Sequence, residues 1–390
     1  MAMKLGVYIQ VPFCQTKCTY CNFHTGVVAR ERYGPYVAAV EREIREHRKM
    51  YREAGIALPE TFADAVVDTI YLGGGTPSLL DPEDLARLLD GVRETFPCAL
   101  REVTLEADPE TVDEEKARGW FQAGIDRISF GLQSFSDREL SAVGRMHRRE
   151  DIERAVPLLR GAGIGNISFD LIAGLPHQTA ESWGATVGEV LAMGPEHISI
   201  YMLEVDEGSR LGREILSKGG RYGANSVPGD DEVANFYDFA RGALSAGGYH
   251  HYEISNWAIP GNESRHNLKY WRREGYLGFG AGAHSFSGTQ RWANEHDAAK
   301  YTEALAAGRI PCEGLEALSA AQALDEELFL GLRQLDGIDI EKIERDYGVQ
   351  LSSRLESLER NGLVERTGPV VRLAPARLSI SNEVFVDLLR

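Results

Sequence analysis

Short apolar, β-branched runs alternate with stretches of helical periodicity between residues 5 and 203. Between the runs, residues 32–52 predict a helix, and Asp81-Pro82-Glu83 has the features of a helix start. Six runs predict strands, covering residues 5–11, 66–72, 102–106, 127–132, 167–172 and 197–203. Six β/α units in series predict a parallel sheet with right-handed crossovers. Both an open sheet and a partial barrel satisfy this pattern.

Polar residues recur at one kind of place, just beyond or near the carboxyl ends of these strands. They are residues 14–21, residues 73–76, Glu106, Gln133 and Asp170. The carboxyl ends of barrel strands meet at one face, and this face carries the chemistry of barrel enzymes. We therefore expect these residues to form one site.

The pattern changes after the sixth strand. The later segments are a loop over 219–231, a helix over 231–247, one strand over 250–257 and a buried segment over 276–286. Two short helices (339–347 and 352–360) and two β-like runs (363–366 and 370–373) then follow. Helix, helix, hairpin is the outline of a winged helix. We expect a partial-barrel core over 1–250, an extension over 251–315 and a smaller, mostly helical, winged-helix-like C-terminal domain over 316–390.

Composition narrows the class of protein. The 390 residues are 43% hydrophobic and 26% charged, and no apolar run approaches the roughly 20 residues of a membrane span. The first residues lack a secretory signal, so a cytoplasmic location is expected. A net charge of −17 argues against nucleic acid as a partner. The densest basic cluster, Arg145, His147, Arg148 and Arg149, is interpreted as solvated surface.

Three of the five cysteines crowd into eight residues. Cys14, Cys18 and Cys21 have C-x3-C-x2-C spacing, which suits a cluster that keeps one iron open, because structural clusters take four cysteines. The alternatives are zinc, with His24 as a fourth ligand, or free thiols. Cys98 and Cys312 have no partner pattern and are interpreted as ordinary small residues.

The cysteine motif resembles the signature of the radical S-adenosylmethionine (SAM) superfamily, which has an aromatic residue, here Tyr20, before the last cysteine. The resemblance implies a [4Fe-4S] cluster whose open iron chelates SAM, and cleavage of SAM to a 5′-deoxyadenosyl radical on reduction. It also implies that Gly73-Gly74-Gly75-Thr76-Pro77 meets the methionine end of SAM. Without the resemblance, a triple glycine is equally typical of an ordinary tight turn and of a ligand-binding loop.

Further motifs resemble the oxygen-independent coproporphyrinogen III oxidase-like family across nearly the whole chain. They are GVYIQVPFC, LEADP, GLQSF, GRMH and DLIAGLP, in that order. By position, the residues expected to contact cluster-bound SAM are Tyr8, Tyr20, Gly74 and Glu106. Those expected to hold a second SAM are Gly75, Thr76, Gln133, Arg145 and Asp170. Glu106 and Asp170 could instead be caps or ion-pair partners, Arg145 a solvated charge, and Gln133 a turn residue. Gln10 departs from the family's usual histidine beside the cluster, so hydrogen bonding there is expected to differ.

Two features separate branches of this family. The true oxidases carry a further cysteine after the triad, whereas Asn22 and Phe23 follow Cys21 here. Residues 266–271 read H-N-x-x-Y-W, which resembles a motif of the heme chaperone branch and makes His266 a candidate heme ligand, with His250 and His251 as competitors. A lone histidine near Tyr and Trp is otherwise more often structural.

The resemblance therefore implies a heme chaperone that binds a [4Fe-4S] cluster, SAM and heme. Its expected partners are heme, a hemoprotein acceptor and an electron donor for the cluster. Contact with a membrane surface and a homodimer are left open, and no catalytic residue is assigned. The alternatives are a radical SAM oxidase, a related methyltransferase or cyclopropanase, and a winged-helix regulator that senses iron or redox state.

Overall fold

The computed structural model describes residues 3–309 and 311–388, which form a twelve-stranded sheet and a three-stranded sheet. The large sheet comprises β1 (Lys4–Val11), β2 (Val66–Gly74), β3 (Cys98–Ala107), β4 (Arg127–Gln133), β5 (Asn166–Ala173), β6 (His197–Met202), β7 (His250–Glu253), β8 (Asn256–Ala258), β9 (Tyr276–Phe279), β10 (His284–Phe286), β11 (Gln290–Asn294) and β12 (Cys312–Ala317). Its order is β12-β11-β10-β9-β1-β2-β3-β4-β5-β6-β8-β7. The first six strands are parallel neighbours, which confirms the six β/α units.

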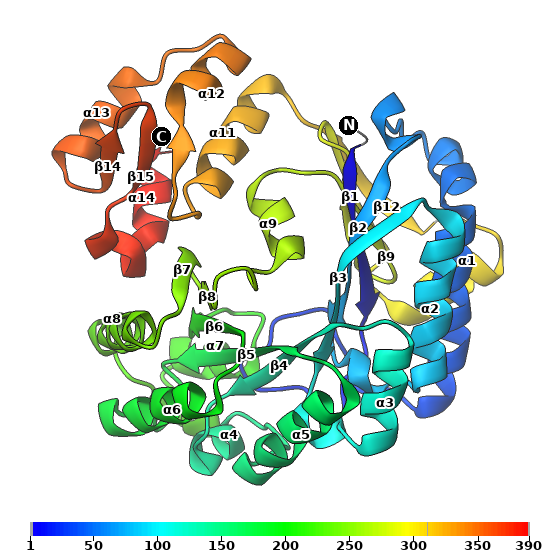
Figure 1. The fold of residues 1–390 in the computed structure, drawn as a ribbon, viewed down its shortest axis with the longest axis horizontal. Coiled ribbons are helices and arrows are strands. Elements are labelled where there is room, and N and C mark those ends of the chain that lie inside the picture. The colour runs from blue at the N-terminus through cyan, green and yellow to red at the C-terminus, as the bar shows by residue number, and fades with distance from the viewer. Residues whose placement is uncertain (1–2, 310, 389–390) are drawn as a thin grey trace.

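Helices cover the outside of the curved sheet (Figure 1). The helices of the core are α1 (Tyr33–Glu53), α2 (Pro82–Thr95), α3 (Glu114–Gln122), α4 (Asp137–Ala142), α5 (Arg149–Ala162), α6 (Ala180–Met193), α7 (Arg210–Leu216) and α8 (Asp230–Ala246). In Figure 1 the strands β1 to β8 follow an arc, with α1 to α6 and α8 outside it. The expected partial barrel is confirmed.

The two faces of each core strand differ in chemistry. In β1, Val7 and Ile9 are fully buried and point outward to the helices, whereas Tyr8 and Gln10 alternate with them and point into the arc. The same alternation places Glu106 on the inner face of β3, beside Leu105 on the outer face. Burial of the outer face stabilises the barrel, and the inner face is left for polar groups.

Strands beyond the sixth extend both edges of the sheet. A single strand over 250–257 is wrong: β7 and β8 form an antiparallel hairpin beside β6, because the chain reverses at Ile254 and Ser255. At the other edge, β9 pairs in parallel with β1, and β10, β11 and β12 follow in antiparallel order. The helix α9 (Arg265–Trp271) lies inside the arc (Figure 1).

The C-terminal region has the winged-helix outline. Its elements are α11 (Ala320–Gly331), β13 (Ile338–Asp339), α12 (Ile340–Tyr347), α13 (Ser352–Arg360), β14 (Val364–Thr367), β15 (Val370–Leu373) and α14 (Ser381–Leu388). The helix α10 (Ala298–Ala306) precedes this region and packs against α1. The hairpin β14–β15 follows two short helices, and β13 completes its three-stranded sheet. This agrees with the expected mostly helical C-terminal domain, while the boundaries at 250 and 315 stay predictions. No helix within the described residues has the length and apolarity of a membrane span.

Candidate functional site

The three cysteines lie in a loop that follows β1 and closes where Gly26 pairs with Phe13, and we call it the cysteine loop. The backbone of Cys14 donates to the Gly26 carbonyl at 3.0 Å, and Cys21 donates to the Cys18 carbonyl at 3.3 Å. All three thiols are free and partly exposed, and burial raises the pKa of the Cys14 thiol. No three His, Cys, Asp or Glu side chains of the described part converge to chelate a single metal ion. A cubane cluster does not require such convergence, because each thiolate binds a different iron.

The glycine loop, residues 73–76, packs against the start of the cysteine loop. Gly75 donates its N–H to the Val11 carbonyl at 2.9 Å, and Thr76 donates to Phe13 at 2.6 Å. A β-carbon on Gly75 would lie 2.4 Å from the Phe13 oxygen, closer than such atoms approach. Gly74 has a φ of 108°, a backbone conformation that favours glycine. Only glycine therefore allows this close approach.

Glu106 lies behind the glycine loop on the inner face of β3. Its carboxylate accepts the Gly74 N–H at 2.9 Å and the Tyr71 hydroxyl at 2.9 Å. Burial raises the pKa of Glu106 to about 7, although these two donors oppose the rise. Because this pKa is near neutral pH, the Glu106 carboxyl group can lose its proton readily when a cationic ligand approaches.

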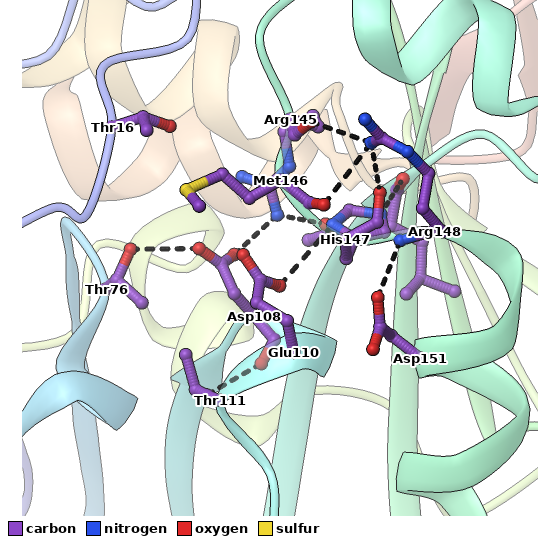
Figure 2. Close-up of polar contacts among 12 residues, drawn as sticks. Thr16, Thr76, Asp108, Glu110, Thr111, Arg145, Met146, His147, Arg148 and Asp151 are labelled. Carbon is purple, nitrogen blue, oxygen red and sulfur yellow. Dashed lines mark hydrogen bonds and ion pairs between the residues drawn. The ribbon is translucent and has the colours of Figure 1, made fainter.

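Asp108 connects the glycine loop to the cysteine loop through Arg145 (Figure 2). The Thr76 hydroxyl donates to one Asp108 oxygen at 3.1 Å, and the Arg145 guanidinium meets the other at 2.5 Å. Arg145 also donates to the Gly131 carbonyl at 2.5 Å, and its Nη1 lies 3.7 Å from the Cys18 sulfur. A positive charge is thus held beside one thiol of the cysteine loop.

Gln133 and Asp170 lie on the neighbouring strands. Gln133 ends β4 with a φ of 60°, which is unusual for a residue other than glycine, and its buried Oε1 has no hydrogen-bond partner. Such strain and an unpaired polar atom are features of ligand-binding positions. Asp170 accepts the Ser129 hydroxyl at 3.0 Å, and burial raises its pKa.

The basic cluster after α4 is solvated only in part, because Arg149 is exposed whereas Arg145 and His147 are not. Arg145 points inward, and the fully buried His147 lies 3.7 Å from Glu110 and 3.1 Å from the Leu132 carbonyl (Figure 2). Burial, and then the Arg145 charge, lower the pKa of His147 to about 4. Burial, and then the Asp108 charge, raise that of Glu110 to about 7. The sequence could not indicate this inward orientation, because charged residues before a helix usually face solvent.

The two expected tyrosines flank the site. Tyr8 points into the barrel, donates to the Gln10 side chain at 2.5 Å and stacks on Tyr71 at 6.1 Å between ring centroids. Gln10, at the usual histidine position, packs against Gly74, where an added β-carbon would lie 2.3 Å from its amide nitrogen. Tyr20 packs among Val143, Ile172 and Leu175.

His266 lies deeper in the barrel than these residues and is 1% exposed. Its Nδ1 is 3.0 Å from the Thr69 hydroxyl, and its Nε2 is 2.9 Å from the Tyr270 hydroxyl. Burial, followed by the Lys269 charge, lowers its pKa to about 3. Glu102 caps the start of α9 by accepting the N–H groups of Arg265 and His266. Both ring nitrogens are therefore engaged, and the role of His266 as a heme ligand stays a prediction.

The structure brings Gly74, Gly75, Thr76 and Glu106 together, and joins Arg145 to them through Asp108. Sequence reasoning missed Asp108 and Tyr71. Asp108 belongs to the quoted Leu-Glu-Ala-Asp-Pro motif, so a signal was present there. Tyr71 stands two residues before the first glycine and carries no signal beyond strand alternation.

Comparison with known proteins agrees with this geometry. The radical SAM superfamily model matches residues 8–190, and the HemN C-terminal domain model matches residues 318–376. Heme chaperone HemW from Bacillus subtilis (strain 168) is 33% identical over 386 residues, covering 97% of this chain and 98% of its own. HemW from Mycobacterium tuberculosis (strain H37Rv) is 35% identical over 387 residues, covering 98% and 94%.

Among solved structures, the Escherichia coli radical SAM enzyme coproporphyrinogen III oxidase (HemN) superposes with a TM-score of 0.81, covering 99% of this chain and 89% of its own. Its 21% identity supports the fold alone. Fold and site thus define a radical SAM protein, a class that implies a [4Fe-4S] cluster and SAM. Within that superfamily, the chain belongs to the HemW family.

Proposed function

We propose that this protein is a heme chaperone that binds a [4Fe-4S] cluster, SAM and heme, and transfers heme to hemoprotein targets. The observation that carries the proposal is similarity along nearly the whole chain to proteins named heme chaperone HemW. Two sequence features support it: Asn22 and Phe23 stand where the oxidases have a further cysteine, and residues 266–271 keep the H-N-x-x-Y-W pattern.

The cluster ligands in this proposal are Cys14, Cys18 and Cys21, because they are the three free thiols of one loop. The cluster and SAM, when bound, supply one-electron chemistry. Residues of the chain form the surroundings of the proposed cluster and SAM. The glycine loop packs closely against Gln10 and Phe13, Glu106 offers a carboxylate, and Arg145 holds a positive charge beside Cys18.

SAM-binding roles are proposed for two sets of residues. Those for cluster-bound SAM are Tyr8, Tyr20, Gly74 and Glu106. Those for a second SAM are Gly75, Thr76, Gln133, Arg145 and Asp170. The unpaired amide oxygen of Gln133 and the bridge from Thr76 through Asp108 to Arg145 support the second set.

The remaining partners follow from this role. An electron donor reduces the cluster, and a hemoprotein accepts the heme. We assign the radical SAM chemistry to residues 1–250, and we assign the H-N-x-x-Y-W helix and the strands around it to residues 251–315. Residues 316–390, which include the winged-helix outline, would serve as a docking or covering module.

The test is an anaerobic assay of the reconstituted protein with hemin, SAM and coproporphyrinogen III. We expect about one heme per chain and no conversion of coproporphyrinogen III to protoporphyrinogen IX. Replacing any one of Cys14, Cys18 and Cys21 by Ala should remove the cluster absorbance, whereas Cys98→Ala should retain it. Decarboxylated product at multiple turnovers would refute the chaperone and favour the enzymatic alternative.

A further inference from the structure

The end of β4 departs from regular strand geometry at Gln133. The pairing of β4 with β5 shifts between Gly131 and Gln133, so β4 carries one extra residue there. The Ser134 N–H donates to the Leu132 carbonyl at 2.7 Å and closes a three-residue γ-turn around Gln133, whose φ is 60°. A γ-turn with a positive φ at its centre is rare and strained, and such backbone persists only where neighbouring groups hold it.

The side chain of Gln133 is buried without a full set of partners. It is 8% exposed, and its Oε1 accepts no hydrogen bond from the residues that the structure describes. An added β-carbon on Gly131 would lie 2.9 Å from the Gln133 Nε2 and 3.2 Å from the Arg145 Nη2, so the amide and the guanidinium lie over the same residue. An unpaired buried amide beside a fixed positive charge is a feature of a site for a polar ligand.

Two side chains from the segment after α4 hold the two carbonyls that precede Gln133. Arg145 donates to the Gly131 carbonyl at 2.5 Å, and the His147 Nε2 lies 3.1 Å from the Leu132 carbonyl. Because a carbonyl only accepts hydrogen bonds, His147 must carry its proton on Nε2 and donate it there. The hydrogen bond from His147 therefore fixes the peptide group that enters the turn.

The surroundings of His147 favour this tautomer. Its side chain is fully buried, and its Nδ1 lies 3.7 Å from the Glu110 carboxyl group (Figure 2). Burial, and then the Arg145 charge, lower the pKa of His147 to about 4, so the ring is uncharged near pH 7 and has a single N–H. That N–H is donated to Leu132, which leaves Nδ1 facing Glu110. His147 is thus held as a neutral donor to one backbone carbonyl.

We propose that His147 is a positioning residue for Gln133: its Nε2–H holds the Leu132 carbonyl, which fixes the strained turn and aims the Gln133 amide at the ligand beside Arg145. The inference rests on the proposed binding of a second SAM by Gln133 and Arg145, and it adds a residue that acts through the backbone. An ordinary buried histidine would stabilise the fold without affecting one ligand site selectively. The Gly-Arg-Met-His motif thus combines a ligand-facing arginine with a histidine that orders the end of β4.

The test is equilibrium dialysis of the anaerobically reconstituted full chain against SAM, which measures the number of SAM molecules bound per chain and each dissociation constant. His147→Leu fills the space of the ring without a donor, and His147→Gln returns an N–H near the position of Nε2. His147→Leu and Gln133→Ala should each weaken the second SAM about tenfold, whereas His147→Gln should stay within about threefold of the wild type. The double variant Gln133→Ala/His147→Leu should bind no more weakly than Gln133→Ala, because His147 acts through Gln133.

His47→Leu is the matched control. His47 is 2% exposed, its Nδ1 lies 2.8 Å from the Ile44 carbonyl, and burial lowers its pKa to about 4, as at His147. It belongs to α1, outside the arc of strands (Figure 1). This variant should lose stability to urea as His147→Leu does, and it should bind both SAM molecules as the wild type does.

The strained turn has a test of its own, which does not depend on the folding of any His147 variant. Gln133→Ala and Gln133→Gly both remove the amide, but only glycine adopts a positive φ without strain. Gln133→Gly should therefore unfold at a higher urea concentration than Gln133→Ala. An equal or lower midpoint would overturn the proposal, because the turn would then hold no strain for His147 to oppose.

The remaining outcomes separate this inference from the function on which it rests. If Gln133→Ala binds SAM as the wild type does, the proposed role of Gln133 is refuted, and the positioning role with it. If Gln133→Ala loses the second SAM but His147→Leu binds it normally, or if their losses add in the double variant, only the positioning role is refuted. An equal loss of cluster-bound SAM in His147→Leu would show a general distortion of the barrel and would also overturn the proposal.

Discussion

His266→Ala tests whether this imidazole holds α9 in place or is free to bind iron. The wild-type ring makes two buried hydrogen bonds, to Thr69 and Tyr270, and fills space that is 1% exposed. Each lost hydrogen bond costs about 1 kcal/mol, and the cavity adds to that cost. We expect the variant to lose about 3 kcal/mol of unfolding free energy at pH 7.

The penalty should also depend on pH, in a direction that the structure defines. The pKa of His266 is about 3 in the folded protein, against the ordinary 6.5. At pH 5 the unfolded wild type therefore binds a proton that the folded wild type does not, which lowers the stability of the wild type but not of the variant. The difference between the two should shrink by about 2 kcal/mol between pH 7 and pH 5.

The assay is urea unfolding followed by circular dichroism at both pH values, with His250→Ala as an exposed control. The control should stay within about 0.5 kcal/mol of the wild type at both. A His266→Ala penalty below about 1 kcal/mol, or one that does not change with pH, would refute the enclosed imidazole. It would return His266 to the position of a free iron ligand.

Two further variants test the site itself. Gly75→Ala places a β-carbon 2.4 Å from the Phe13 oxygen, so it should abolish SAM binding in equilibrium dialysis, whereas Gly161→Ala, with no atom near its added carbon, should not; tight SAM binding by the first variant would contradict the packing described for the glycine loop. Because the pKa of Glu106 is about 7, the affinity for cationic SAM should rise about tenfold from pH 6 to pH 8 in the wild type. It should be flat in Glu106→Gln, and an equal rise in that variant would exclude this carboxylate as the titrating group.

Much of the fold is predictable because the outer face of the barrel is uniformly apolar. Runs such as residues 167–172 signal strands, since Ile167, Phe169 and Leu171 bury one face against helices. The hairpin at β7–β8 was missed although Ser255 and Asn256 are residue types common in turns, because the aromatic residues on either side of them predicted one strand.

The sequence predicted the position of a site residue only where that residue follows or ends a strand of the barrel. The placement of Glu106 and Thr76 follows from that rule. The partnership of Asp108 with Arg145 could not be predicted, because 37 positions separate them and only the sheet brings them together. The enclosure of His266 was equally hidden, since seven residues of α9 give no pattern that says which face meets the barrel.

The two hydrogen bonds from Gly75 and Thr76 to Val11 and Phe13 also bear on how the protein matures. They tie the base of the cysteine loop to β2 through backbone groups alone, without any contribution from a bound cofactor. The sheet itself therefore orders the base of the cysteine loop, which reduces the conformational entropy that cluster binding has to offset.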